Sequence, residues 1–143
     1  GSSKMNPLFL SERHPVSHKA AILADEGTSV WLYMTDSGSD YPAADCWLLN
    51  TVPSPEHLNE HCDNNAPPAI LKFVVPGSEG DAPLESDIEL RWAPDGHSVA
   101  LLVKGTPLGF IAQGNKHGYS KNLVTASPFG MPFEQELYER LFP

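Results

Sequence analysis

Basic side chains are missing from a long part of this 143-residue sequence. Residues 20–71 contain eight carboxylates and no lysine or arginine, and residues 20–90 contain thirteen acids against Lys72 alone. The local charge of −12 leaves +3 for the remainder of a chain whose net charge is −9. This balance disfavours nucleic-acid phosphates and anionic lipid as partners and favours a cation or a basic protein. A solvated acidic surface that only improves solubility is the alternative.

Long hydrophobic runs are also missing, and cysteine is scarce. No segment approaches the roughly 18 apolar residues of a membrane span, and no basic segment with an apolar run follows Met5. Two cysteines, Cys46 and Cys62, are too few for a disulfide scaffold. We therefore predict a cytoplasmic protein with reduced thiols. One bridge in a periplasmic protein whose signal peptide has been removed is the alternative. Residues 1–4 are typical of a cloning remnant, which leaves residues 5–143 as a single domain.

The sequence contains no recognisable enzyme motif. A nucleophile elbow, a phosphate-binding loop and a dinucleotide fingerprint are all missing. Ser17-His18 can be combined with any of many aspartates, but such pairs arise in every sequence. We predict a non-enzymatic protein without a cofactor, inactive on esters, phosphodiesters, glycosides and peptides.

Residues 87–112 carry the clearest structural pattern. Residues 88–92 alternate apolar and polar side chains, as in a strand with one buried face. The sequence Ala-Pro-Asp-Gly at residues 93–96 is typical of a turn, and residues 98–103 are nearly all apolar, as in a strand buried on both faces. A second turn then leads into a strand at residues 108–112. The three strands predict a meander.

The other segments predict shorter elements. Further strands are expected at residues 20–24, 29–34, 45–52 and 69–75, and at a sheet edge at residues 120–125. Residues 5–19 predict an irregular arm, residues 76–83 an exposed loop, and Ser54 the start of a short helix. Phe133, Leu137 and Leu141 form the apolar stripe of a terminal helix at residues 133–142. We expect a core containing Trp92, Val99, Leu101, Val103, Phe110 and Leu137.

These elements predict an α+β fold. Its mostly antiparallel, twisted sheet has six or seven strands, with the C-terminal α-helix packed on it and one short helix beside it. Two of the hairpins also resemble each other. The segment D-E-G-T-S-V-W-L-Y-M from Asp25 matches P-D-G-H-S-V-A-L-L-V from Pro94 at an offset of 69 residues. Two related three-stranded units and chance similarity are both consistent with this match.

His57 and His61 are spaced to lie on one face of the expected short helix, with Cys62 beside them. Two imidazoles and a thiolate can ligate zinc. A complete site needs further ligands at a characteristic spacing, and the sequence shows none. Surface histidines without a metal are therefore the preferred interpretation, and a metal site is the alternative.

The hairpin R-W-A-P-D-G-H-S-V-A-L-L-V resembles the strand-turn-strand of TolB-like propeller blades. Together with K-G-T-P-L-G-F-I it resembles a small bacterial family of uncharacterised proteins that carry a W-x-P-D-G hairpin. The resemblance departs after Phe110, where Ile111-Ala112-Gln113 stand in place of an aromatic residue and an acid. It implies no activity and no catalytic residues. The short, acidic, β-rich chain is also loosely similar to immunity proteins of toxin systems.

We therefore predict a protein-binding module of the immunity type, which neutralises a basic toxin through its acidic half. Binding residues tend to lie in loops, and an exposed aromatic beside carboxylates is typical of a binding hot spot. The predicted contact residues are Asp36, Asp40, Tyr41 and Asp45, followed by Glu79, Asp81 and Glu85. A metal-binding protein and a structural homo-oligomer joined through strand edges are the alternatives.

Overall fold

The computed structural model describes residues 9–25, 29–39, 41–51, 69–78, 80, 85–127 and 129–142. These residues form a four-stranded sheet in the order β1-β2-β3-β4 and a five-stranded sheet in the order β5-β6-β7-β8-β9. The strands are β1 Phe9–Arg13, β2 Ala20–Asp25, β3 Ser29–Thr35, β4 Pro42–Asn50, β5 Ile88–Trp92, β6 Val99–Val103, β7 Thr106–Ile111, β8 Tyr119–Ser120 and β9 Met131–Pro132. The helices are the 3-10 turns η2 Leu71–Phe73 and η3 Glu85–Asp87 and the α-helix α1 Gln135–Leu141.

The predicted α+β class is confirmed. Neighbouring strands pair antiparallel, apart from the parallel pair of β8 and β9. The nine described strands exceed the six or seven that were predicted, and they form two sheets in place of one. The two matching hairpins, β2–β3 and β5–β6, lie in different sheets.

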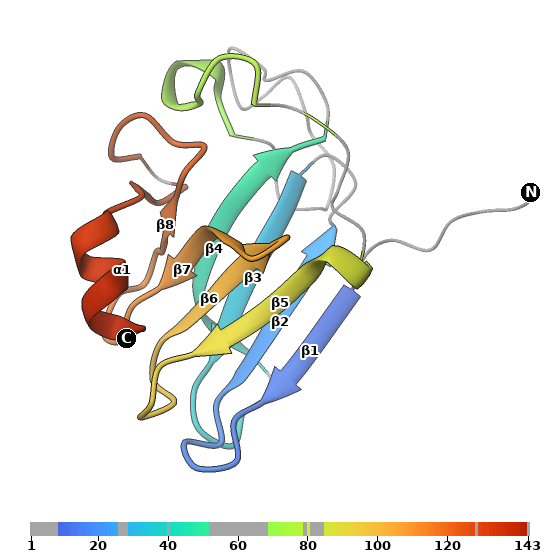
Figure 1. Ribbon diagram of the computed structural model, residues 1–143, viewed down its shortest axis with the longest axis vertical. Helices are drawn as coiled ribbons and strands as arrows, with labels where there is room; N and C mark the ends of the chain where they lie inside the picture. The colour runs from blue at the N-terminus through green and yellow to red at the C-terminus, as the bar shows by residue number, and fades with distance from the viewer. Residues whose placement is uncertain are drawn as a thin grey trace, which may run out of the picture.

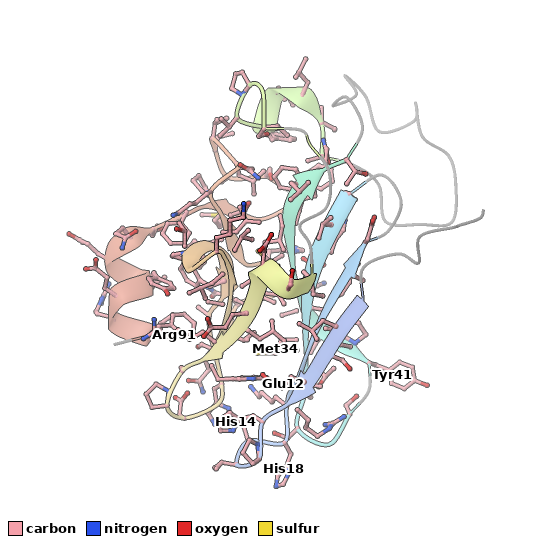
Figure 2. The ribbon with its side chains drawn as sticks, turned by 45° about the vertical axis from the view of Figure 1, so that its right-hand side comes forward. Glu12, His14, His18, Met34, Tyr41 and Arg91 are labelled. Carbon is pink, nitrogen blue, oxygen red and sulfur yellow. The ribbon has the colours of Figure 1, made fainter. Side chains whose placement is uncertain are left out.

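The two sheets pack face to face. Figure 1 looks onto them, with β5 to β7 in front of β1 to β4, and the turned view in Figure 2 separates α1, the five-stranded sheet and the four-stranded sheet from left to right. One apolar cluster fills the space between the sheets. Its fully buried members include Leu23, Leu32, Leu48, Val99, Leu101 and Ile111. Because side chains alternate along a strand, the apolar residues that point outward from each sheet need a cover of their own.

Aromatic side chains of α1 and of the segment before it cover the outer face of the five-stranded sheet. Phe110 is fully buried at the centre of this cluster. Its ring stacks on Tyr119 at a centroid distance of 4.7 Å and meets Phe133 edge-on at 5.3 Å. The rings of Tyr138 and Phe142 both lie 5.9 Å from it. The predicted packing of the C-terminal helix on the sheet is therefore confirmed.

Residues 69–75, together with Leu123 and Phe129, cover the outer face of the four-stranded sheet. Trp47 is fully buried beneath them, and Trp31 is buried beside it. Phe129 packs on the Trp31 ring at 6.3 Å. This cover explains why β3 and β4 are buried over most of their length, although they belong to a sheet at the surface of the fold.

The strand predicted at residues 69–75 is wrong. The segment contains η2 and a single β-bridge, between Val74 and Leu123. The Asn50 side chain accepts a hydrogen bond from the Ala69 N–H at 2.8 Å and donates one to the Ala69 carbonyl at 3.0 Å. The Asn50 amide satisfies Ala69, and the N–H groups of Phe73 and Val74 bond to carbonyls within the segment, so these groups do not need a neighbouring strand.

The irregular arm predicted for residues 5–19 is wrong where β1 forms. Leu10 lies opposite Leu23 of β2 and packs against the cluster between the sheets. The strand is short and its last three residues are polar, so its period-two pattern is weak in the sequence. The edge strand predicted at residues 120–125 is limited to β8, because the chain turns directly after it.

The meander predicted for residues 87–112 is confirmed as β5, β6 and β7. Gly96 has a φ of 76° in the first turn, whereas Lys104 at 53° and Gly105 at 81° form the second. Two consecutive residues with positive φ are typical of a tight hairpin turn that matches the twist of its strands. Of the predicted core residues, Val99, Leu101 and Phe110 are fully buried, and Trp92, Val103 and Leu137 are half-buried.

The two sheets are joined by backbone hydrogen bonds between β4 and the segment before β8. The Asp45 N–H donates to the Lys116 carbonyl at 2.9 Å, and the Gly118 N–H donates to the Asp45 carbonyl at 2.7 Å. We call this junction of Asp45 with residues 116–118 the seam. It fixes one side of the sandwich, whereas β1 and β5 are the edge strands on the other side.

Gly118→Ala should destabilise the fold. A Cβ atom at this position would lie 2.5 Å from the Phe110 carbonyl oxygen and 2.7 Å from the Cys46 Cβ, so the seam has to shift. We expect a loss of about 1–3 kcal/mol in the free energy of unfolding, as for other overpacked sites. Urea denaturation measures it. Gly80→Ala is the matched control, because nothing lies within 4 Å of a Cβ there. Equal stabilities of the two variants would contradict a tightly packed seam.

Candidate functional site

The loop between β1 and β2 is one helical turn capped by a histidine. The Nδ1 atom of His14 accepts the N–H of Val16 at 3.1 Å and that of Ser17 at 3.2 Å. The His14 carbonyl accepts the His18 N–H at 3.0 Å. Pro15 follows at the first helical position, where its missing N–H has no cost. His14 therefore acts as the N-cap of the turn, and because its Nδ1 accepts, the neutral ring carries its proton on Nε2.

The loop between β3 and β4 is hydrogen-bonded to this capped turn. The Ser37 hydroxyl donates to the Ser17 carbonyl at 2.6 Å, and the Gly38 N–H donates to the His18 carbonyl at 2.9 Å. Gly38 has a φ of 75°, which a residue with a Cβ rarely adopts. The backbone of one loop thus supports the backbone of the other.

Arg13 bridges the same two loops. Its Nη1 donates to the His18 carbonyl at 2.6 Å, and its Nη2 donates to the Ser39 carbonyl at 3.2 Å. We call residues 13–19, 36–39 and 41 together the tip. Hydrogen bonds from a charged donor to neutral carbonyls are stronger than those between neutral groups, so Arg13 contributes to the order of the whole tip.

The tip exposes two large apolar side chains. Tyr41 is 82% exposed and Val16 is 73% exposed, the highest values among the large hydrophobic residues of the described chain. The Tyr41 N–H donates to the Ser39 hydroxyl at 3.0 Å, which anchors its backbone. Figure 2 shows Tyr41 projecting away from the sheets at the same end of the molecule as His14 and His18. An exposed aromatic side chain is a candidate anchor for a binding partner.

The first predicted contact cluster is divided by the structure. Asp36 and Tyr41 are both exposed at the tip, and Asp40 lies outside the described residues. Asp45 lies within β4, and its Oδ1 is 2.7 Å from the Nδ1 of His117. The two side chains are 32% and 39% exposed. Asp45 therefore belongs to the seam, where its carboxylate already has a partner.

The side chains of the second predicted cluster lie outside the described residues. Glu79 and Asp81 lie outside the described residues, and so does the side chain of Glu85 at the start of η3. Gly80 donates its N–H to the Asn50 carbonyl at 3.0 Å, at the end of β4 opposite to the tip. A strand of this length spans roughly 25 Å. One compact surface does not include both the tip and Gly80.

The structure does not test the predicted zinc ligands. His57, His61 and Cys62 all lie outside the described residues, as does the short helix expected from Ser54. In the described part of the chain, no three His, Cys, Asp or Glu side chains are grouped to hold a metal ion. The metal site stays a prediction.

The Cys46 thiol is free and fully buried at the seam. It donates a hydrogen bond to the Tyr119 carbonyl at 3.2 Å. Burial raises the pKa of this thiol far above its usual range, and the Asp45 carboxylate raises it further, although a backbone hydrogen bond from Phe110 lowers it. Because the thiolate is the reactive form, this cysteine is a packing residue and not a nucleophile.

Side chains connect the two sheets on the side of β1 and β5. The indole N–H of Trp92 donates to the Glu12 carboxylate at 2.9 Å, and the His14 ring meets the indole edge-on at 5.3 Å. Gly96 leaves room for that ring, since a Cβ there would lie 2.5 Å from the His14 Nδ1. Sequence reasoning missed these roles of Glu12 and His14. The signal that could have found the capped turn is the His14-Pro15 pair itself.

No helix among the described residues is long and apolar enough to cross a membrane. No known protein family, curated protein or solved structure matches the chain. The resemblance of the β5–β6 hairpin to propeller blades and to a small bacterial family therefore stays a prediction.

Cys46 should be unreactive in the folded protein. In a Cys62→Ser variant, which leaves it as the sole thiol, we expect labelling by a disulfide reagent such as DTNB to follow the rate of global unfolding. In denaturant the same thiol should react within seconds. Labelling of the folded variant at the rate of a small free thiol would show that the site is open to solvent.

Proposed function

We propose that this protein is a non-enzymatic protein-binding module whose contact surface is the tip. The observation that carries this proposal is Tyr41, which is 82% exposed on a loop whose backbone is held by hydrogen bonds. Aromatic anchors dominate the energetics of many interfaces. A backbone that is already ordered loses little conformational freedom on binding. Val16, on the neighbouring loop, adds a second apolar contact.

The partner that we propose is a basic protein, and the biological role that we favour is neutralisation of a toxin. Residues 20–90, which include the Tyr41 loop, carry a charge of −12. Such a field speeds the approach of a cationic partner. Among the described residues of the tip, the cations Arg13 and Lys19 outnumber the single carboxylate of Asp36, so the steering field comes from the acidic stretch as a whole. Exposed carboxylates add little affinity, which leaves the apolar anchors to supply it.

Tyr41→Ala should abolish most of the affinity. A basic protein captured at low salt from the source organism would be purified, and its binding measured by surface plasmon resonance. Loss of an anchor costs about 2 kcal/mol, or roughly thirtyfold in Kd, mostly through faster dissociation.

Val124→Ala is the matched control for Tyr41→Ala. Val124 is also an exposed apolar residue, at 50%, but it lies in the cover at the other end of β4, where its N–H donates to the Phe73 carbonyl. Its substitution should leave Kd unchanged. Equal effects of the two substitutions, or capture of no basic protein at low salt, would refute the tip as the contact surface.

Asp36→Lys should slow association without changing dissociation. Reversal of one charge at the tip is expected to lower the association rate several-fold at low salt, and the difference should fade as salt screens the field. Glu136→Lys changes the net charge equally on the exposed side of α1, and it should have a much smaller effect. If both charge reversals slow association equally, the effect comes from the net charge of the protein and not from the location of the charge at the tip.

A further inference from the structure

We infer that His14 is a pH-dependent switch of the tip: when its ring gains a second proton, the capped turn at residues 15–18 is released. The switch is built into the loop and needs no partner. Its consequence for binding rests on the proposed function of the tip.

The two hydrogen bonds at Nδ1 are incompatible with a charged ring. Nδ1 uses its lone pair to accept the N–H groups of Val16 and Ser17, at 3.1 and 3.2 Å. An imidazolium carries a proton on each nitrogen and has no acceptor. A protonated His14 would direct an N–H at two other N–H groups. The charged ring and the capped turn therefore exclude each other, and histidine is the side chain that changes charge between pH 5 and 8.

The surroundings of the ring give the charged form an alternative set of contacts. The Trp92 indole lies 5.3 Å from the His14 ring, and the same indole is hydrogen-bonded to the Glu12 carboxylate at 2.9 Å. An aromatic ring and a carboxylate both attract a cation. Protonation thus exchanges the bonds of His14 to its own loop for attraction toward β1 and β5. The charged and histidine side chains on these elements and on the loop hydrogen-bonded to the turn are Glu12, Arg13, His18, Lys19, Asp36, Glu89, Arg91, Asp95 and His97.

Release of the turn would reach the Tyr41 loop through three hydrogen bonds. The Ser17 carbonyl accepts from Ser37, and the His18 carbonyl accepts from Gly38 and from Arg13. His18 itself has a positive φ of 61°, a conformation that the hydrogen bonds of the loop have to maintain. When the cap is lost, the acceptors for the second loop lose their fixed positions. Acidification should therefore loosen the whole tip while the sheets stay folded.

The test is a pH titration of the full chain by NMR, from pH 8 to pH 5. At pH 8 the ring nitrogens of His14 should show the tautomer with the proton on Nε2. On acidification the amide signals of Val16, Ser17 and Gly38 should shift with the same midpoint as the His14 ring. Their protection from hydrogen exchange, corrected for intrinsic rates, should fall several-fold relative to amides in β6.

Two variants separate His14 from its neighbours. His14→Asn places a carbonyl oxygen on Cγ where the imidazole has Nδ1, and asparagine is among the best N-caps but does not titrate. In this variant the three amide shifts should become independent of pH. His18→Asn removes the other histidine of the loop and tolerates a positive φ, and it should retain the wild-type response.

A proton on Nδ1 at pH 8 would overturn the switch, and this measurement on the wild-type protein needs no variant. Ring titration without any response of the three amides would overturn it as well, as would an unchanged response in His14→Asn.

Tyr41→Ala distinguishes the switch from the proposed function. If the Tyr41→Ala variant keeps both the pH response of the three amides and the affinity for the partner, the tip is not the contact surface and the switch stands. If it abolishes binding while the wild-type amides do not titrate, the contact surface stands and the switch is wrong.

Discussion

The backbone hydrogen bonds of the seam are the constraint on which the two-sheet arrangement depends. They hold Asp45 of one sheet against residues 116–118, which lead into the other, and the glycine at 118 allows the two backbones to touch. On the opposite side the sheets are connected by side chains, at Glu12, Trp92 and His14. One side is therefore fixed by main chain, and the other can respond to the chemistry of a few side chains. The loop of the tip between β1 and β2 is attached to the second side, whereas its loop between β3 and β4 leads into the strand that carries the seam.

The parts of the fold that depend on local pattern could be predicted from the sequence. The alternation at residues 88–92 and the turn glycine at 96 specify β5, β6 and β7 without reference to the rest of the chain. Residues 69–75 have the composition of a strand, but their structure depends on the amide of Asn50, which is adjacent only after folding. β1 could not be predicted from its own short sequence, because its burial depends on its pairing with β2.

The candidate site could be predicted only in part, for the same reason. Tyr41 follows from composition, because an aromatic residue in a polar loop is conspicuous in a sequence. That Asp45 does not join Tyr41 in one contact cluster could not be predicted from composition. Asp45 is engaged by His117, which lies 72 positions later in the chain. His14 carries a local signal in the proline that follows it. Its contact with Trp92 joins segments that the sequence does not connect.

The long sequence separation across the seam has a consequence for the order of folding. Each hairpin of the first sheet closes a short loop, whereas the seam must close one of about seventy residues, which is slower and entropically more costly. During translation the first four strands are synthesised before any residue of β5 to β9. Their inner face, with Leu23, Leu32 and Leu48, then lacks the sheet that buries it. The nascent chain should depend on a holding chaperone during that interval, and its tendency to aggregate should follow the speed of translation.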